Sequence, residues 1–218
     1  MFIGHYAVAL AAKKAAPKTS LGTLFMASQL IDLIWPVFLL LGLEHVKVSP
    51  GNTVVTPLEF YDYPLTHSLI GVLFWALLFG AFYFYIKRDT RSTLILSLCV
   101  ISHWVLDYIT HRPDLPLSFS GDKFFGLGLW NSLQATLAVE AGLFIIGITI
   151  YIKTTKAVDR KGIYGFWSLI ALLLLIYAGN IFGSAPPDES AIGYVGLLGW
   201  LFIPWAYWID KHRNVISF

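Results

Sequence analysis

The stretch ILSLCVISHWVLDYITH, residues 95–111, places three ionisable side chains at steps of four within an apolar run. On an α-helix, a step of four residues turns about 40° beyond a full circle. His103 and Asp107 would therefore lie on one face, with His111 further round. Ionisable side chains are costly in hydrocarbon and are expected to face a partner, an ion or water. The stretch thus predicts a membrane-spanning helix with one polar, functional face.

The rest of the chain has the composition of an integral membrane protein. Of its 218 residues, 57% are hydrophobic and only 13% are charged, whereas an ordinary soluble domain has about 25% charged residues. The mean hydropathy is +0.69. Crossing about 30 Å of hydrocarbon takes roughly 20 apolar residues. We expect one all-α domain over residues 1–218, a bundle with six transmembrane helices near 21–42, 65–86, 92–110, 130–152, 162–182 and 191–209.

The opening segment FIGHYAVALAA, residues 2–12, is too short to span a membrane before Lys13 and Lys14. Its positive charges follow the apolar part instead of preceding it, which is not the pattern of a secretory signal. We expect a short half-helix over residues 2–14, packed on the bundle and carrying His5 inward.

The basic residues predict the orientation in the membrane. If Lys13 and Lys14 are cytoplasmic, six crossings place twelve of the fifteen Lys and Arg residues on that side. This asymmetry matches the excess of positive charge in short cytoplasmic loops, so both termini are expected in the cytoplasm. The formal net charge of +2 then reflects topology, and no concentrated basic patch indicates a nucleic-acid partner.

The long connections on the other side, residues 44–64 and 111–126, are rich in Pro, Gly, Ser and acidic residues. They are expected to be irregular, and long loops often carry function. Tyr61 and Tyr63, beside His67, are predicted to line a substrate entrance.

The end of the central helix offers a second candidate for substrate binding. His111 with Arg112 would bind an anionic headgroup, or would mark a helix end whose long side chain reaches the interface just before Pro113. The headgroup interpretation is slightly favoured.

Several spans also carry a histidine or a carboxylate in the middle or outer half of the membrane. Neutral imidazole and carboxylate together favour a divalent transition metal, zinc first, with manganese or iron as alternatives. His103 and Asp107 have the i, i+4 spacing of two ligands on one helix. The other candidate ligands are Asp32, His67, His5 and Glu140.

These candidates are enough for one or two ions. Asp32 and His67 would complete a set of four with the helical pair. His5 and Glu140 would remain to bind a second ion, and Asp107 would be a ligand of both ions. Two ions about 3.5–4 Å apart suit the attack of water on a phosphoester, and Glu140 or Asp107 would act as the base that orients this water.

Each candidate also has a purely structural interpretation. His103 or His67 alone would more often be a buried histidine bonded to a helix carbonyl, and Glu140 alone could pair with Thr136 or with a neighbouring helix. Because charged groups are rare inside membranes, several of them in this order favour a shared metal site.

Four pieces of the chain resemble the motifs of the bacterial membrane-bound metal-dependent hydrolases, an inner-membrane family related in sequence pattern to zinc-dependent phospholipase C and its nuclease relatives. The resemblance covers roughly the first 150 residues, and the last two spans are less distinctive. The pieces are FIGHYAVAL (2–10), LIDLIWP (30–36), YPLTHSLIG (63–71) and SHWVLDYITH (102–111).

The resemblance implies a ligand set. In the soluble relatives one zinc is held by an Asp, a His and an H-x-x-x-D pair in that chain order, which Asp32, His67, His103 and Asp107 repeat. His5 falls where an early His binds a neighbouring zinc. A third zinc in the relatives uses a later His and an H-x-x-x-E pair. Here the corresponding positions are His111, Thr136 and Glu140. Threonine is a poor zinc ligand, so we expect one or two metals and no third.

The resemblance further implies phosphoester hydrolysis in a bacterial inner membrane, and the depth of the site favours a lipid or a lipid-linked phosphate as substrate. Three other classes of function remain open. A metal or proton transporter would also bury His and carboxylates, although it usually shows paired repeats. A haem-binding bundle would use His67 and His103 as axial ligands. A non-catalytic metal-binding protein would differ only in lacking an open coordination position.

Overall fold

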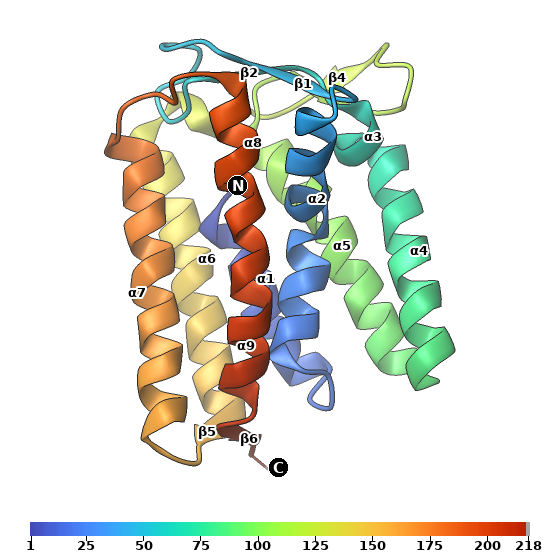
Figure 1. Cartoon of the computed structure of the whole chain (residues 1–218), viewed down its shortest axis with the longest axis vertical. Coiled ribbons are helices and arrows are strands. Elements are labelled where there is room, and N and C mark those ends of the chain that lie inside the picture. The colour runs from blue at the N-terminus through green and yellow to red at the C-terminus, as the bar shows by residue number, and fades with distance from the viewer. Residues whose placement is uncertain (217–218) are drawn as a thin grey trace.

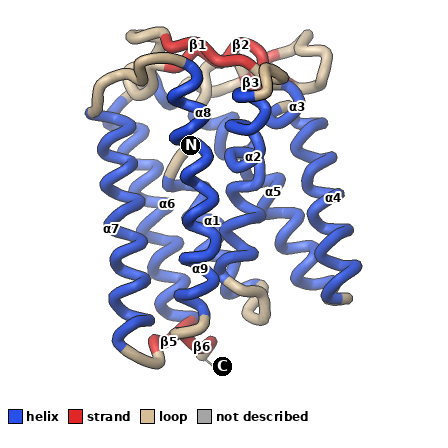
Figure 2. The backbone as a smooth tube through the Cα atoms, viewed as in Figure 1, coloured by secondary structure: helices blue, strands red, loops and turns tan. Residues whose placement is uncertain are grey.

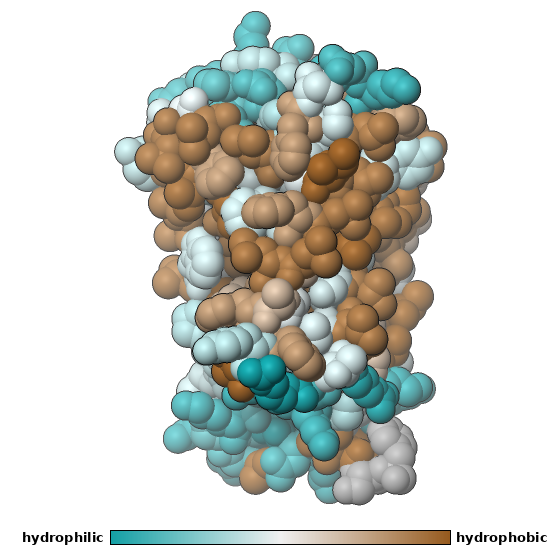
Figure 3. Space-filling model, turned by 90° about the vertical axis from the view of Figure 1, so that its right-hand side faces the viewer, coloured by the Kyte–Doolittle hydropathy of each residue, from teal (hydrophilic) through white to brown (hydrophobic). Residues whose placement is uncertain are grey.

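Six long apolar helical runs lie side by side in the computed structural model, which describes residues 1–216 (Figures 1 and 2). Each run is long and apolar enough to cross a membrane, which confirms the all-α, polytopic prediction. On the face shown in Figure 3, apolar side chains cover the middle of the protein and polar side chains gather at both ends. The runs are α2 (Leu21–Leu40), α4 (Leu69–Lys87), α5 (Thr90–Thr110), α6 (Leu133–Thr154), α7 (Arg160–Phe182) and Glu189–Asp210. The last run comprises α8 (Glu189–Leu197), a 3₁₀ turn (Leu198–Leu201) and α9 (Phe202–Asp210).

The start of every long run is capped by a short polar side chain. Each capping oxygen accepts a hydrogen bond from the backbone N–H three residues later, which satisfies a donor that the helix itself leaves free. The helix boundaries are therefore encoded locally and fall within a few residues of the sequence prediction. The caps are Ser20, Ser68, Asp89, Ser132, Asp159 and Asp188.

The short helix α1 (Ile3–Ala15) lies inside the bundle, against α2, α5 and α6 (Figure 1). Ile3, Ala9 and Leu10 are fully buried, and Gly147 of α6 allows its helix to approach the backbone of α1 at Ala7. The prediction of a short, packed half-helix is confirmed within one residue at each end. Its position in the core brings His5 into the interior of the bundle.

The two ends of the bundle differ. At one end, which we call the loop end, the connections 41–68 and 111–132 contain two antiparallel pairs. Short strands therefore interrupt the irregular structure expected there, and Val46 and Phe60, which pair across two of these strands, pack on Trp35. At the other, basic end, β5 (Thr155–Ala157) pairs with β6 (Arg213–Val215). The pairs at the loop end are β1 (His45–Val48) with β2 (Leu58–Asp62), and β3 (Leu115–Pro116) with β4 (Phe124–Phe125). A 3₁₀ turn (Leu129–Asn131) precedes α6.

The second span begins later than the apolar run suggests. A single turn, α3 (Pro64–His67), precedes α4, and Ser68 between them has an extended backbone with ψ of 151°. This break turns the side chain of His67 into the bundle, where it is buried. There Nε2 of His67 lies 3.5 Å from Oδ1 of Asp32, a residue of α2.

An ion pair joins α1 to α9 near the basic end. The ammonium group of Lys13 lies 2.9 Å and 3.1 Å from the two carboxylate oxygens of Asp210 and donates to the carbonyl of Thr19 at 2.8 Å. The side chain of Lys13 is 4% exposed and that of Asp210 is 18% exposed. Removing one partner leaves the other charge with little water to solvate it.

We expect Lys13→Met to destabilise the protein by about 2 to 3 kcal/mol, because Asp210 would lose its buried partner. The measurement is the midpoint of thermal unfolding in detergent. The neighbouring Lys14 is exposed, so Lys14→Met is the matched control and should unfold close to wild type. Identical midpoints for the two variants would contradict the role given to the pair.

Candidate metal centre

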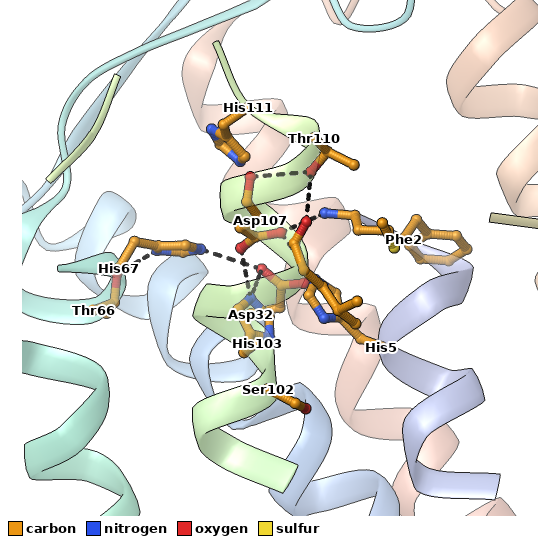
Figure 4. A network of polar contacts seen from close by, with 12 residues as sticks. Phe2, His5, Asp32, Thr66, His67, Ser102, His103, Asp107, Thr110 and His111 are labelled. Carbon is orange, nitrogen blue, oxygen red and sulfur yellow. Dashed lines mark hydrogen bonds and ion pairs between the residues drawn. The ribbon is translucent and has the colours of Figure 1, made fainter. Parts of the chain in front are cut away.

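Five ionisable side chains from four helices meet in the half of the bundle nearer the loop end (Figure 4). In the described part of the chain, two groups of possible ligands have donor atoms within 4.8 Å of one another, and both groups contain His103. All five side chains are buried except that of Asp32, which is 39% exposed and faces a cavity. The groups are His5, His103 and Asp107, and Asp32, His67 and His103.

The spacing of Asp32, His67 and His103 is close to that of ligands around a common cation, and Asp107 lies next to His103. Oδ1 of Asp32 lies 3.5 Å from Nε2 of His67 and 3.5 Å from Nε2 of His103. Oδ2 of Asp107 lies 3.2 Å from Nε2 of His103. Zinc bonds of about 2.0–2.1 Å in a tetrahedron put neighbouring donor atoms about 3.3–3.4 Å apart. The two 3.5 Å separations are longer than an ordinary hydrogen bond.

The imidazole of His103 is held with its Nε2 toward this centre. Its Nδ1 lies 3.1 Å from the carbonyl oxygen of Ser28, and because a carbonyl only accepts, Nδ1 carries the proton. Nε2 then has the free lone pair, and it is a fully buried atom without a hydrogen-bond partner among residues 1–216. A metal-binding histidine is usually oriented in this way by a backbone carbonyl. The donor set therefore fits a divalent cation.

His67 is oriented by two further residues. Its Nδ1 lies 2.8 Å from the hydroxyl of Thr66, which donates its own proton to Oε2 of Glu44 at 2.6 Å. The hydroxyl must therefore accept from Nδ1–H, which leaves Nε2 of His67 free to face Asp32. Glu44 is fully buried and also accepts from the backbone N–H of Thr66 at 2.8 Å.

Glu44 is the functional candidate that sequence reasoning missed. It follows the last turn of α2 in a polar loop, and nothing in its spacing from the motifs distinguishes it from the other acids of that loop. Burial raises the pKa of Glu44, while the charge of His67 and the hydrogen bonds from Thr66 act in the opposite direction. Only the folding of the loop end brings this carboxylate next to Thr66.

His5 joins the same centre through Asp107. Its Nε2 lies 3.1 Å from Oδ1 of Asp107, and its ring is stacked on that of His103 at 3.7 Å, with an angle of 2° between the planes. The amino group of Met1 also donates to Oδ1 of Asp107. Asp107 thus directs Oδ2 at His103 and Oδ1 at His5, and Oδ1 also accepts from Met1.

Glu140 lies nearby and outside both groups of donors. Its carboxylate accepts from the backbone N–H of Phe2 at 3.0 Å, at the start of α1, and it lines the cavity. A negative charge at the N-terminus of a helix is favourable, so this contact stabilises the position of α1. The structure therefore places Glu140 beside the centre, bound to a neighbouring helix, and its metal-binding and catalytic roles stay predictions. Thr136, four residues earlier, donates to the carbonyl of Leu129 at 2.9 Å.

His111 and Arg112 already have partners at the loop end. Nδ1 of His111 lies 2.9 Å from Asp114, and its ring lies 4.3 Å from that of Trp130. Arg112 lies 3.1 Å from Asp114 and 3.6 Å from Glu59. Two carboxylates therefore compensate the charge of Arg112, and the headgroup-binding role of His111 and Arg112 stays a prediction.

The two tyrosines lie on opposite sides of the chain. Tyr63 is buried, its ring lies 5.0 Å from that of His67, and its hydroxyl lies 3.3 Å from Nδ1 of His111. Tyr61 is 56% exposed and lies against the exposed His45. The residues that line the cavity include His111 and neither tyrosine, so their role at an entrance stays a prediction.

Comparison of the chain with protein-family models, curated proteins and solved structures gave no match. The likeness to membrane-bound metal-dependent hydrolases therefore rests on the four motifs quoted above. The geometry of the centre does not depend on that likeness, because it follows from distances between atoms of this chain.

We expect Glu44→Gln to weaken binding of Zn²⁺ roughly 10- to 100-fold, as loss of the group that orients a ligand commonly does. The neutral amide would no longer polarise the hydroxyl of Thr66, which holds the ring of His67. The measurement is a zinc titration of metal-free protein. Glu59→Gln, in the same loop region and without contact to Thr66, is the control. Wild-type affinity in Glu44→Gln would exclude the orienting role.

Proposed function

We propose that the protein is a membrane-embedded, metal-dependent hydrolase of phosphoesters, with zinc as the first candidate and manganese or iron as alternatives. The single observation that supports this most strongly is the buried, unpartnered Nε2 of His103, surrounded by oxygens of Asp32 and Asp107 at 3.2–3.5 Å. A buried polar atom without a partner is costly, and binding a cation would remove that cost.

In this proposal Asp32, His67 and His103, one of the two donor groups, hold one ion and leave its fourth position open to the cavity, with Asp107 beside it. The free lone pair of His103 binds one ion only, so the two donor groups cannot both be filled through it. A second ion would replace the hydrogen bond between His5 and Asp107 and would share the carboxylate of Asp107.

A divalent cation in this position polarises a phosphoryl oxygen and lowers the pKa of bound water. The residues of the chain would orient the substrate and accept the proton. Because Oδ1 of Asp107 accepts from Met1 and its Oδ2 faces the free Nε2 of His103, Glu140 is the better candidate for the base. It lines the cavity beside Asp107 and accepts from backbone N–H groups at the start of α1.

The open side of the centre favours an enzyme over a purely structural metal site. Structural zinc sites are closed by four protein ligands, whereas catalytic sites keep access for water or substrate. The side chain of Asp32 is 39% exposed, and Asp32, His67 and Asp107 all line the cavity. A closed structural site would have no need of this access.

We further propose that the basic end faces the cytoplasm of a bacterial inner membrane. The asymmetry of twelve basic residues against three supports this orientation. The metal centre would then lie in the outer half of the bilayer, where the phosphates of lipids are within reach.

We expect the detergent-purified protein to contain at least one equivalent of metal, and His67→Ala and His103→Ala to lose it. Elemental analysis after reconstitution with zinc is the measurement. His45→Ala is the control, because His45 is exposed at the loop end and pairs with Asp62. If a second ion is bound, His5→Ala would lower the number of metal ions per protein molecule from two to one. A wild-type protein that holds no metal after reconstitution would remove the proposal.

We expect Glu140→Gln to lower kcat about 10²- to 10⁴-fold on a soluble phosphodiester such as bis(p-nitrophenyl) phosphate, the usual effect of removing a general base. Metal content should stay at the wild-type value, because Glu140 lies outside both donor groups. Full activity in Glu140→Gln would exclude it as the base and return that role to Asp107.

A further inference from the structure

The cavity beside the metal centre continues beyond the polar residues. Its volume is about 620 Å³, within the range of roughly 300–1,000 Å³ that is common for ligand sites. At one end lie Asp32, His67 and Asp107, and from there it extends between α7 and α8. The walls of this extension are mainly apolar and include Leu33, Pro36, Ile176, Ile181, Ile192 and Val195. We call this extension the apolar arm.

The apolar arm reaches the side of the bundle. Val195 and Leu198 both line the cavity, and they are 66% and 56% exposed. Both belong to the run Glu189–Asp210, which is long and apolar enough to span a membrane. On α7, Gly179 also lines the arm and is exposed. Figure 1 shows α7 and α8 as separate columns near the loop end. The mouth of the arm therefore opens at the level of the spanning helices.

The loop end covers the same cavity from above. Val55, Thr56 and Pro57, in the connection between β1 and β2, contribute to its lining, as do Pro186 and Pro187 after α7. Val55 is 9% exposed, so its side chain is directed into the protein. A molecule that enters from water would meet this cover, whereas a molecule that enters from the bilayer would meet apolar helix surface.

A cavity with a polar end and an apolar arm fits an amphiphile. Its apolar walls gain free energy only if hydrocarbon covers them, and a small soluble phosphoester would leave them in contact with water. We propose that the apolar arm binds a hydrocarbon chain of a lipid phosphoester, which enters sideways between α7 and α8. The position of its phosphate at the Asp32–His103 centre rests on the function proposed above, whereas the binding of the chain does not.

The test uses Gly179, which offers a matched pair. A Cβ added at Gly179 meets no atom within 4 Å, and the same holds for Gly142 of α6, which does not line the cavity. Gly179→Trp adds a large side chain at the lining of the apolar arm, at a position where its Cβ meets no other atom. Gly142→Trp adds the same side chain to another spanning helix and is the control.

We expect Gly179→Trp to lower kcat/KM for dioleoyl phosphatidylglycerol about tenfold, the effect of losing roughly two buried methylene groups. Hydrolysis of bis(p-nitrophenyl) phosphate and the metal content should stay at wild-type values. Gly142→Trp should match wild type with both substrates. Equal loss on both substrates, or no loss on the lipid, would overturn the proposed arm.

Binding separates this proposal from the proposed hydrolysis. Native mass spectrometry of the detergent-purified protein titrated with dioleoyl phosphatidylglycerol should show about tenfold weaker binding in Gly179→Trp than in wild type and in Gly142→Trp. If none of the proteins hydrolyses either substrate and this difference in binding is found, the hydrolase proposal fails and the lipid site stands. Equal binding by all three proteins would remove the lipid site whatever the activity.

Discussion

The structure depends on one constraint, which is the cost of placing ionisable side chains inside hydrocarbon. A charged side chain near the middle of a membrane costs a few kcal/mol even on the lower scales, unless it finds a partner, an ion or water. His5, His103 and Asp107 are almost completely buried, and each lies against another member of the centre. The convergence of α1, α2, α3 and α5 brings their ionisable side chains against one another, and it leaves Nε2 of His103 without a hydrogen-bond partner among residues 1–216 (Figure 4).

The residues around the centre explain why it is held in one arrangement. The carbonyl of Ser28 fixes His103, and the pair Thr66 and Glu44 fixes His67. Glu44 and Thr66 lie in or beside the loop end, whose β1–β2 pair packs on Trp35 through Val46 and Phe60. The loop end therefore does more than connect helices, because its packing sets the orientation of a candidate ligand and covers the cavity next to it.

The polar and apolar parts of the cavity are continuous, and this continuity links the proposed chemistry to the membrane. The polar end is made by α2, α3 and α5, whereas the apolar arm is made largely by α2, α7 and α8. The last two spans, which carry little of the sequence resemblance, thus form the wall that would select a hydrocarbon chain. In this proposal the first part of the chain supplies the chemistry and the last part supplies the contact with lipid.

The sequence alone determined the class of the protein, the approximate bounds of its spans and most of the candidate ligands. Hydropathy and caps such as Ser20 and Asp89 act over a few residues, so they can be read without the fold. The i, i+4 pair His103 and Asp107 is local in the same way. The bounds of α1 and the buried position of His5 also agreed with expectation.

Only the tertiary structure decided which of these residues meet. The break at Ser68 turns His67 toward Asp32, and the folding of the loop end places Glu44 behind Thr66 and His67. It also sets Glu140 at the start of α1 and pairs Arg112 with Asp114 and Glu59. Such contacts join residues far apart in the chain and are determined by how the helices pack. Hydropathy and residue spacing describe only neighbours along one helix, so they could not predict these contacts.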